Sequence, residues 1–419
     1  MFWLVEKVDQ VSSFREKGYR EAFVEIIPYS DKVHPCLNKI SLVYIKPLNE
    51  GKGYILPINH NEAFSLEEEL VEEVLRGIDT IYVRDKKNFL HYFFHKACYQ
   101  SQPSSPTYIP ERTQAYKFYN NLYPKRKDVN LIIPIAKHYE MCDGVFSEQI
   151  IPKNPNKFYD NKACVVFNMI EANGIKIDNT TYQRCFNEGA EDYAYTNYNL
   201  NTLTTRPSNA FGGVNFAALN KENGEREAFI PNNDFFLDLD ISAYHPTLLA
   251  SLIGYKFDNG DIHQAFADMY GVDYNKAKEL TFKQMYGGVF DQYKDLEFFK
   301  KVKAYTTKLW AEYTTNGYIK CPISEYIFKQ EDLENMNPQK LLNYLLQNLE
   351  TSNNILILWD ILKILRGKKT KLVLYVYDSF LFDFDISEKD IFYKIKEVFE
   401  RRELNIKIKK GINYNFKKA

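Results

Sequence analysis

The chain has 419 residues, 45% of them hydrophobic and 26% charged, so it is long enough to bury cores in two or three domains. Its 54 basic and 55 acidic side chains leave a net charge of −1, which argues weakly against a uniformly basic nucleic-acid-binding protein. No CxxC pair and no long apolar run occurs, which argues against a zinc ribbon, a disulfide scaffold and a membrane-spanning helix. We therefore expect a cytoplasmic protein without membrane contact.

The first hundred residues alternate short β-rich runs with turns and then with helical patterns. The expected elements are strands within 21–27, 39–45, 53–58 and 80–85, an acidic helix near 65–76 and a helix within 87–99. The Pro- and Ser-rich residues 100–111 are expected to form an exposed loop. This order predicts a small α/β domain.

Helical patterns return at 129–150 and 160–172, and a Thr/Asn-rich stretch at 196–209 follows. After residue 260 the pattern is largely helical until a predicted strand pair at 372–384. The last nineteen residues carry seven Lys or Arg side chains against one Glu, which gives a nearly neutral chain one basic end.

Two acids interrupt the apolar segment "FFLDLDISAYHPTLLASL" at 235–252. Asp238 and Asp240 are two residues apart, so in a strand both side chains lie on the same face. Carboxylates are rarely buried unless they are paired or hold a metal. This strand therefore predicts either an ion pair or a metal site.

Two further segments belong with this strand. In the predicted helix "KAKELTFKQMYGG" (276–288), Lys278, Phe282 and Tyr286 recur every four residues and share one face. Such a stripe taken alone is more often core packing. Asp378 follows an apolar strand in "VYDSF", where a lone aspartate is normally a turn former.

The three segments together indicate a two-metal chemistry. Two Mg²⁺ ions about 4 Å apart, held by two aspartates, can activate a hydroxyl and stabilise a pyrophosphate leaving group. A neighbouring lysine would neutralise phosphate charge, and flat side chains would pack on an incoming base and sugar.

In these and other motifs the chain resembles the family A DNA polymerases, the bacterial DNA polymerase I group. "LDLDISAYHPTLLASL" is similar to the first palm motif and "YVYDSFLF" to the last, and "GDIHQAFADMYG" and "KAKELTFKQMYGG" are similar to the fingers segments. "NYLLQ" keeps an N-x3-Q spacing, and "VVFNMIEANGIKID" and "TTRPSNAFGGVNFAALN" resemble the segments on either side of the thumb. The motifs follow in the family's order over nearly the whole length.

The resemblance implies a role for each matching residue. Asp240 and Asp378 would be catalytic and, with Ile241, would bind two Mg²⁺ ions, with Mn²⁺ as a substitute. The residues implied in binding the deoxynucleoside triphosphate are His263, Lys278, Phe282, Tyr286, His245 and Lys276. The residues implied in binding primer–template DNA are Arg206, Asn215, Asn343 and Gln347.

Several positions depart from the family pattern. His245 replaces a glutamate that excludes a ribose 2′-hydroxyl, and Ser379 replaces a glutamate next to the second metal aspartate. A histidine is bulky enough to serve as a gate, so a preference for deoxynucleotides is expected. The family's arginine before the fingers lysine falls on Tyr274, and Lys276 is the substitute, although it lies two residues further along the helix.

The expected fold class is multidomain α+β: an RNase H-like exonuclease-type domain, then a right-hand polymerase with an antiparallel palm sheet, helical fingers and a reduced thumb. The expected domains are 1–152, exonuclease-like; 153–205, thumb or connector; and 206–419, palm and fingers, with the fingers at about 255–320. A short thumb predicts ready dissociation from the primer unless the basic C-terminus or a replisome or processivity partner compensates.

The exonuclease-type domain is expected to be degenerate. Of the family's D-x-E pair only Glu25 is left, with Ile27 at the partner position, and Tyr139 and Asp143 keep a Y-x3-D spacing. Two-metal hydrolysis needs several carboxylates at once, so no proofreading is predicted.

The predicted function is that of a template-directed DNA polymerase, in the host cytoplasm if the chain is phage-encoded. Two alternatives stay open. One is an RNA polymerase or primase-like nucleotidyltransferase on the same palm, suggested by His245. The other is an inactive, polymerase-derived, nucleic-acid-binding replisome component, suggested by the short thumb and the degenerate exonuclease motifs.

Overall fold

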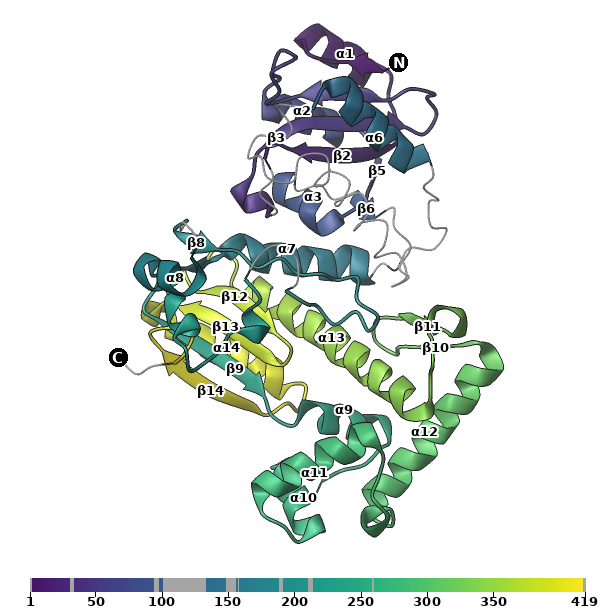
Figure 1. The fold of residues 1–419 in the computed structure, drawn as a ribbon, viewed down its shortest axis with the longest axis vertical. Helices are drawn as coiled ribbons and strands as arrows, with labels where there is room; N and C mark the ends of the chain where they lie inside the picture. The colour runs from purple at the N-terminus through teal and green to yellow at the C-terminus, as the bar shows by residue number, and fades with distance from the viewer. Residues whose placement is uncertain are drawn as a thin grey trace. The chain divides into compact units, whose positions relative to one another are not determined.

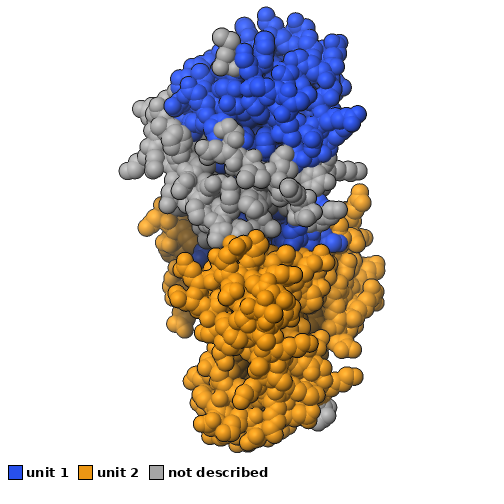
Figure 2. All heavy atoms as spheres, turned by 90° about the vertical axis from the view of Figure 1, so that its right-hand side faces the viewer, with its two compact units in different colours: residues 1–174, 194–201, 209–215 blue, residues 175–193, 202–208, 216–419 orange. Residues whose placement is uncertain are grey.

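The structure is a computed structural model that describes residues 2–30, 34–93, 98–100, 133–147, 156, 158–187, 191–209, 214–257 and 260–416. Of the loop expected at 100–111, Gln100 instead ends a strand, and residues 101–111 lie outside the described residues. The chain forms two compact units, coloured in Figure 2. Unit 1 comprises residues 1–174, 194–201 and 209–215, and unit 2 comprises residues 175–193, 202–208 and 216–419.

Unit 1 is built on a six-stranded mixed sheet with the order β1-β4-β3-β2-β5-β6. Strands β4, β3 and β2 pair antiparallel, whereas β1, β5 and β6 pair parallel with their neighbours. The strands are β1 (Trp3–Leu4), β2 (Glu21–Pro28), β3 (Ile40–Pro47), β4 (Tyr54–Pro57), β5 (Thr80–Val83) and β6 (Cys98–Gln100).

Helices pack on both faces of this sheet (Figure 1). Side chains alternate along a strand, so Val24 and Val43 lie in one core with helices α1, α2 and α3, and Phe23 and Tyr44 lie in a second core with α6. The helices are α1 (Val8–Glu16), α2 (Glu68–Arg76), α3 (Lys86–Tyr92), α6 (Ile135–Ser147) and α7 (Cys164–Asn173). The predicted α/β character of this region is confirmed, but the helix expected within 87–99 ends at Tyr92, and β6 follows.

Unit 2 is built on a four-stranded antiparallel sheet with the order β12-β13-β9-β14. Its strands are β9 (Phe235–Ile241), β12 (Lys371–Val376), β13 (Ser379–Phe384) and β14 (Ile406–Gly411). Its helices are α8 (Asn179–Phe186), α9 (Tyr244–Leu252), α10 (Ile262–Tyr270), α11 (Tyr274–Gly287), α12 (Glu297–Asn316), α13 (Pro338–Ile364) and α14 (Lys389–Glu400).

The largely helical pattern expected between 260 and 372 is interrupted by a hairpin of β10 (Tyr318–Lys320) and β11 (Ile327–Lys329). A short pair of β7 (Ile175–Lys176) and β8 (Tyr193–Ala194) completes the strands of the described residues.

Helix α13, with 27 residues, runs through the core of unit 2 (Figure 1). The Asn337 side chain accepts from the Lys340 amide and Pro338 occupies the first turn, two features that favour a helix start. Its apolar side chains are buried against α9, α12 and α14, which fixes which way its polar side chains face. In the described part of the chain, no helix is long and apolar enough to cross a bilayer.

Candidate active site

The two predicted metal aspartates lie side by side at one end of the unit 2 sheet. In the β9–β13 register Asp240 is opposite Ser379, and the Ile241 amide donates to the Asp378 carbonyl at 3.0 Å. Asp378 occupies the two-residue turn between β12 and β13, and its neighbour Tyr377 has a φ of +59°. Antiparallel pairing therefore brings together two acids that are 138 positions apart in the sequence.

Both aspartates line one pocket of unit 2. Burial, then the negative charges of Asp240 and Glu350, raise the pKa of Asp378 to about 6. Such a shift means that the carboxylate form is poorly neutralised by the surrounding protein. A bound cation would relieve that repulsion, and carboxylate and backbone oxygens are the ligands that Mg²⁺ prefers.

Asp238, on the same strand, has different surroundings. It is 3% exposed, accepts from the Ser379 hydroxyl, and lies 3.2 Å from the Lys409 ammonium on β14. Burial raises its pKa, while Ser379 and Lys409 act in the opposite direction. Asp238 is thus a buried, paired carboxylate, and the residues that line the pocket do not include it.

The helix stripe predicted from its four-residue spacing faces this pocket. Lys278, Phe282 and Tyr286 on α11 all line it, and the Phe282 and Tyr286 rings are stacked with centroids 6.1 Å apart. The stripe is therefore a pocket wall and not core packing. Lys276 is not brought to the pocket: two residues turn the helix by more than half a circle, and its ammonium pairs with the exposed Glu279 at 3.2 Å.

His263 on α10 is buried and lines the same pocket. Its Nδ1 atom has no hydrogen-bond partner among the described residues. Burial, then the nearby charge of Lys278, lower the pKa of His263, so the ring is neutral at pH 7. A buried ring nitrogen without a partner can accept a hydrogen bond from a ligand or, once protonated, pair with an anion.

The predicted DNA-binding residues divide between the two units. Arg206, Asn343 and Gln347 line the pocket of unit 2, where Gln347 donates to Asn343 at 3.1 Å and accepts from Thr204 at 3.0 Å. Asn215 is exposed, belongs to unit 1, and is not among the residues lining the pocket.

Arg206 is already engaged by the protein. Its guanidinium donates to Glu350 at 3.1 Å and lies 3.9 Å from the centre of the Tyr377 ring. These contacts hold the arginine next to the turn that carries Asp378.

Two charged pocket residues were missed from the sequence. Glu350 follows Asn343 and Gln347 at seven and three residues on α13, a spacing that shares a helix face and could have drawn attention to it. Lys407 on β14 lies directly opposite Asp240 in the β14–β9 register. In the sequence Lys407 belongs to the basic C-terminus, for which the only predicted role is to help retain the primer.

The acids left from the exonuclease pattern in unit 1 are each bound to a cation. Glu25 makes a two-point contact with Arg84 at 2.5 and 2.8 Å. Asp143 accepts from Tyr44 at 2.9 Å and from Lys46 at 3.1 Å, and Ile27 is buried in the core. Carboxylates occupied in this way are poor ligands for a metal ion.

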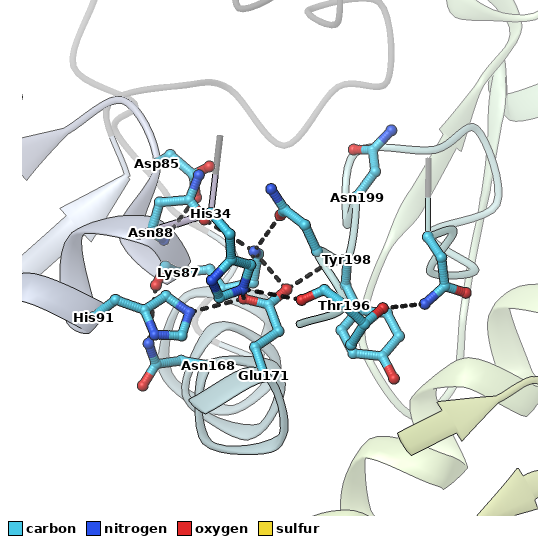
Figure 3. A network of polar contacts seen from close by, with 12 residues as sticks. His34, Asp85, Lys87, Asn88, His91, Asn168, Glu171, Thr196, Tyr198 and Asn199 are labelled. Carbon is cyan, nitrogen blue, oxygen red and sulfur yellow. Dashed lines mark hydrogen bonds and ion pairs between the residues drawn. The ribbon is translucent and has the colours of Figure 1, made fainter. Parts of the chain in front are cut away.

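A second group of metal-capable side chains, His34, His91 and Glu171, lies in unit 1 with its ligand atoms within 4.8 Å of one another (Figure 3). The Lys87 ammonium occupies this group, at 2.7 and 2.8 Å from the two Glu171 oxygens. Burial lowers the pKa of His34 to about 4, and its Nδ1 accepts from the Cys36 amide. The group is a closed ion-pair network between α3 and α7.

Comparison with solved structures shows a polymerase-domain fold. The chain is similar to the POL domain of Pol1 from M. smegmatis, solved in complex with DNA primer-template and dNTP, with a TM-score of 0.71. The likeness covers 98% of this chain and 99% of that chain at 11% sequence identity, so it concerns the fold alone. No protein-family model and no curated protein matches the sequence. The prediction of a polymerase-domain fold is confirmed, whereas membership of family A and the RNase H-like character of unit 1 stay predictions.

Proposed function

We propose that the protein is a template-directed DNA polymerase that adds deoxynucleotides to a primer 3′ end. The observation that carries the proposal is the pocket of unit 2, whose lining combines the carboxylates of Asp240 and Asp378 with the ammonium groups of Lys278 and Lys407. Acidic and basic side chains within one pocket suit a metal-dependent reaction on a triphosphate.

The acidic side chains of the pocket fit Mg²⁺. The carboxylates of Asp240 and Asp378 and the backbone of Ile241 would hold it, with Mn²⁺ as a substitute. When bound, two such ions stabilise charge on the transferred phosphate and lower the pKa of the attacking hydroxyl.

The basic side chains of the pocket suit the triphosphate. Lys278 and Lys407 offer exposed ammonium groups, and His263 offers its unpaired Nδ1 atom. The rings of Phe282, Tyr286 and His245 form the wall against which base and sugar would pack. A wall this bulky favours a deoxyribose over a ribose, which supports DNA over RNA as the product.

Primer and template would contact Arg206, Asn343 and Gln347 at the pocket and Asn215 on unit 1. The segment between 178 and 204, short for a thumb, would give weak processivity without a partner. We assign unit 1 to a degenerate exonuclease domain without proofreading, because Glu25 and Asp143 are both neutralised by neighbouring cations. The predicted location is the cytoplasm.

Extension of a labelled primer–template by purified protein tests the proposal. Wild type should extend with deoxynucleotides and Mg²⁺, and Asp378→Asn should lose at least about a thousandfold in rate while it stays folded and keeps its DNA affinity. The exposed Asp390→Asn is the matched control. Equal signal from wild type and Asp378→Asn would refute the proposal and favour an inactive replisome component, and faster extension with ribonucleotides would favour the RNA polymerase alternative.

A further inference from the structure

His245 on α9 lies between two side chains from different helices. Its Nδ1 atom is hydrogen-bonded to the Tyr286 hydroxyl on α11, and its Nε2 atom to the Glu350 carboxylate on α13. Both ring nitrogens are therefore occupied. The imidazole is 8% exposed, which leaves the ring little freedom to turn.

Glu350 has both of its carboxylate oxygens engaged. It is 1% exposed, its Oε2 atom accepts from His245, and Arg206 donates to Oε1 at 3.1 Å and to Oε2 at 3.4 Å. A buried carboxylate is tolerated only when it is paired and hydrogen-bonded, and here a guanidinium and an imidazole meet that need. Glu350 therefore acts through His245 and Arg206 and not as a free metal ligand.

The carboxylate also fixes where the protons lie. It can only accept, so His245 carries its proton on Nε2, and in the neutral ring Nδ1 then accepts from the Tyr286 hydroxyl. Burial, then the charge of Glu350, raise the pKa of Tyr286, so the phenol keeps the proton that it donates. The series Glu350, His245, Tyr286 thus has one consistent direction of hydrogen bonding.

Tyr286 needs such an anchor because of its place on α11. It stands one residue before the end of the helix at Gly287, it is 36% exposed, and the next residue, Gly288, has a φ of +102°. The last turn of a helix lacks part of its hydrogen bonding, and glycine lets the chain leave in several directions. Stacking on Phe282 holds one side of the ring, and His245 holds its hydroxyl.

We propose that Glu350 is a positioning residue which, through His245, fixes the Tyr286 ring in the nucleotide pocket and so sets both the affinity for the deoxynucleotide and the discrimination against a ribonucleotide. The inference rests on the proposed polymerase function. Arg206 extends the same network to Tyr377 and hence to the turn that carries Asp378.

Single-nucleotide incorporation kinetics test this role. For Glu350→Ala we expect the KM for dNTP to rise about tenfold and the preference for dNTP over rNTP to fall about fivefold, because the variant removes a hydrogen bond to a charged group. Glu350→Ala also leaves Arg206, a proposed DNA contact, without its carboxylate, so the primer–template Kd is measured separately and the KM values are compared at saturating primer–template. Glu350→Gln, whose amide oxygen still accepts from His245 Nε2, should recover most of both parameters.

A double-mutant cycle separates positioning from general loss of structure. Tyr286→Phe removes only the hydroxyl end of the series, so once it is present Glu350→Ala should cost little more, and the combined effect should be smaller than the product of the two. Glu397→Ala, at an exposed glutamate of α14 that pairs with Arg401, is the control and should behave as wild type.

The outcomes distinguish the two levels of the proposal. A wild-type protein that extends no primer refutes the polymerase function itself. An active wild type with a folded Glu350→Ala variant that keeps its KM and sugar preference, or with effects of Glu350→Ala and Tyr286→Phe that multiply independently, refutes the positioning role alone. If Glu350→Ala fails to fold, Tyr286→Phe still decides the question, because a Tyr286→Phe variant with the wild-type KM and sugar preference refutes the role of the hydroxyl anchor.

Discussion

Replacing Lys87 by methionine would leave a buried acid in unit 1 without its main partner. The side chains of Lys87 and Glu171 are 1% and 0% exposed, and the ammonium also donates to Asn197 at 3.0 Å. Removing one member of a buried pair costs roughly 3–5 kcal/mol. His91 and the Tyr198 amide still donate to Glu171 in the variant, so we expect about 3 kcal/mol, the lower end of that range.

The pH dependence follows from the direction of the shift. In wild type burial alone would raise the pKa of Glu171, but Lys87 and His91 outweigh it and the net pKa lies below 4.5. The pair therefore stabilises unit 1 above that pH and loses its effect as the pH falls through the lowered pKa. In Lys87→Met the unpaired carboxyl has a raised pKa, so the deficit of the variant should shrink as the pH falls from 8 towards 5.

Urea titration followed by hydrogen exchange of the β2 and β3 amides measures the free energy of unfolding of unit 1. Lys137→Met, at an exposed lysine on α6, should cost less than about 0.5 kcal/mol and is the control. Lys87→Met combined with Glu171→Gln removes both charges and should recover about 2 kcal/mol. A single variant as stable as wild type, or a double variant no better than the single one, would refute the ion-pair argument.

Three further predictions concern the pocket and unit 1. Because the pKa of Asp378 is raised from 3.8 to about 6 on folding, its ionisation costs unit 2 stability progressively between those two pH values and in full above 6; Asp378→Asn should raise the Tm most at pH 8 in a chelator, less at pH 5 and not below pH 3.8, and added Mg²⁺ at pH 8 should narrow the difference. Lys278→Ala should raise the KM for dNTP about tenfold with an unchanged primer–template Kd, measured by single-nucleotide incorporation. Wild type with Mg²⁺ should release no nucleotide from a mismatched primer. If wild type does release nucleotide and Glu25→Ala abolishes that release, the assignment of unit 1 as a domain without proofreading is contradicted.

The parts of the site that sequence could predict depend on local periodicity. The four-residue spacing on α11 fixes which side chains share its face, and a turn between two apolar strands places Asp378 at a strand end. Ordered motifs over the whole chain then predicted the polymerase-domain fold at an identity of 11% to the solved structure. Helix periodicity also explains why Lys276 does not line the pocket, because it lies two residues before Lys278 and its side chain therefore points away from the pocket.

The residues that sequence missed depend on pairing between distant segments. Lys407 is placed by the β14–β9 register, which a basic strand pattern alone does not reveal. Glu350 is placed by the packing of α13 against α9 and α11, and its partners come from other segments of unit 2. Periodicity could place Glu350 on the same face of α13 as Asn343 and Gln347. It could not predict that a histidine and an arginine from other segments would pair with this buried carboxylate and stabilise it.

The two acids of β9 show how one strand supports two different roles. Lys409 approaches both, at 3.2 Å from Asp238 and 3.5 Å from Asp240, but only Asp238 also receives the Ser379 hydroxyl. Asp238 is thus closed off by partners within the sheet, whereas Asp240 opens on the pocket beside Asp378, whose pKa is raised to about 6 by burial and then by the charges of Asp240 and Glu350. Since Ser379 and Lys409 close off Asp238 while Asp378 is left beside the charges of Asp240 and Glu350, the free energy that folding does not recover at Asp378 is available to bind a cation.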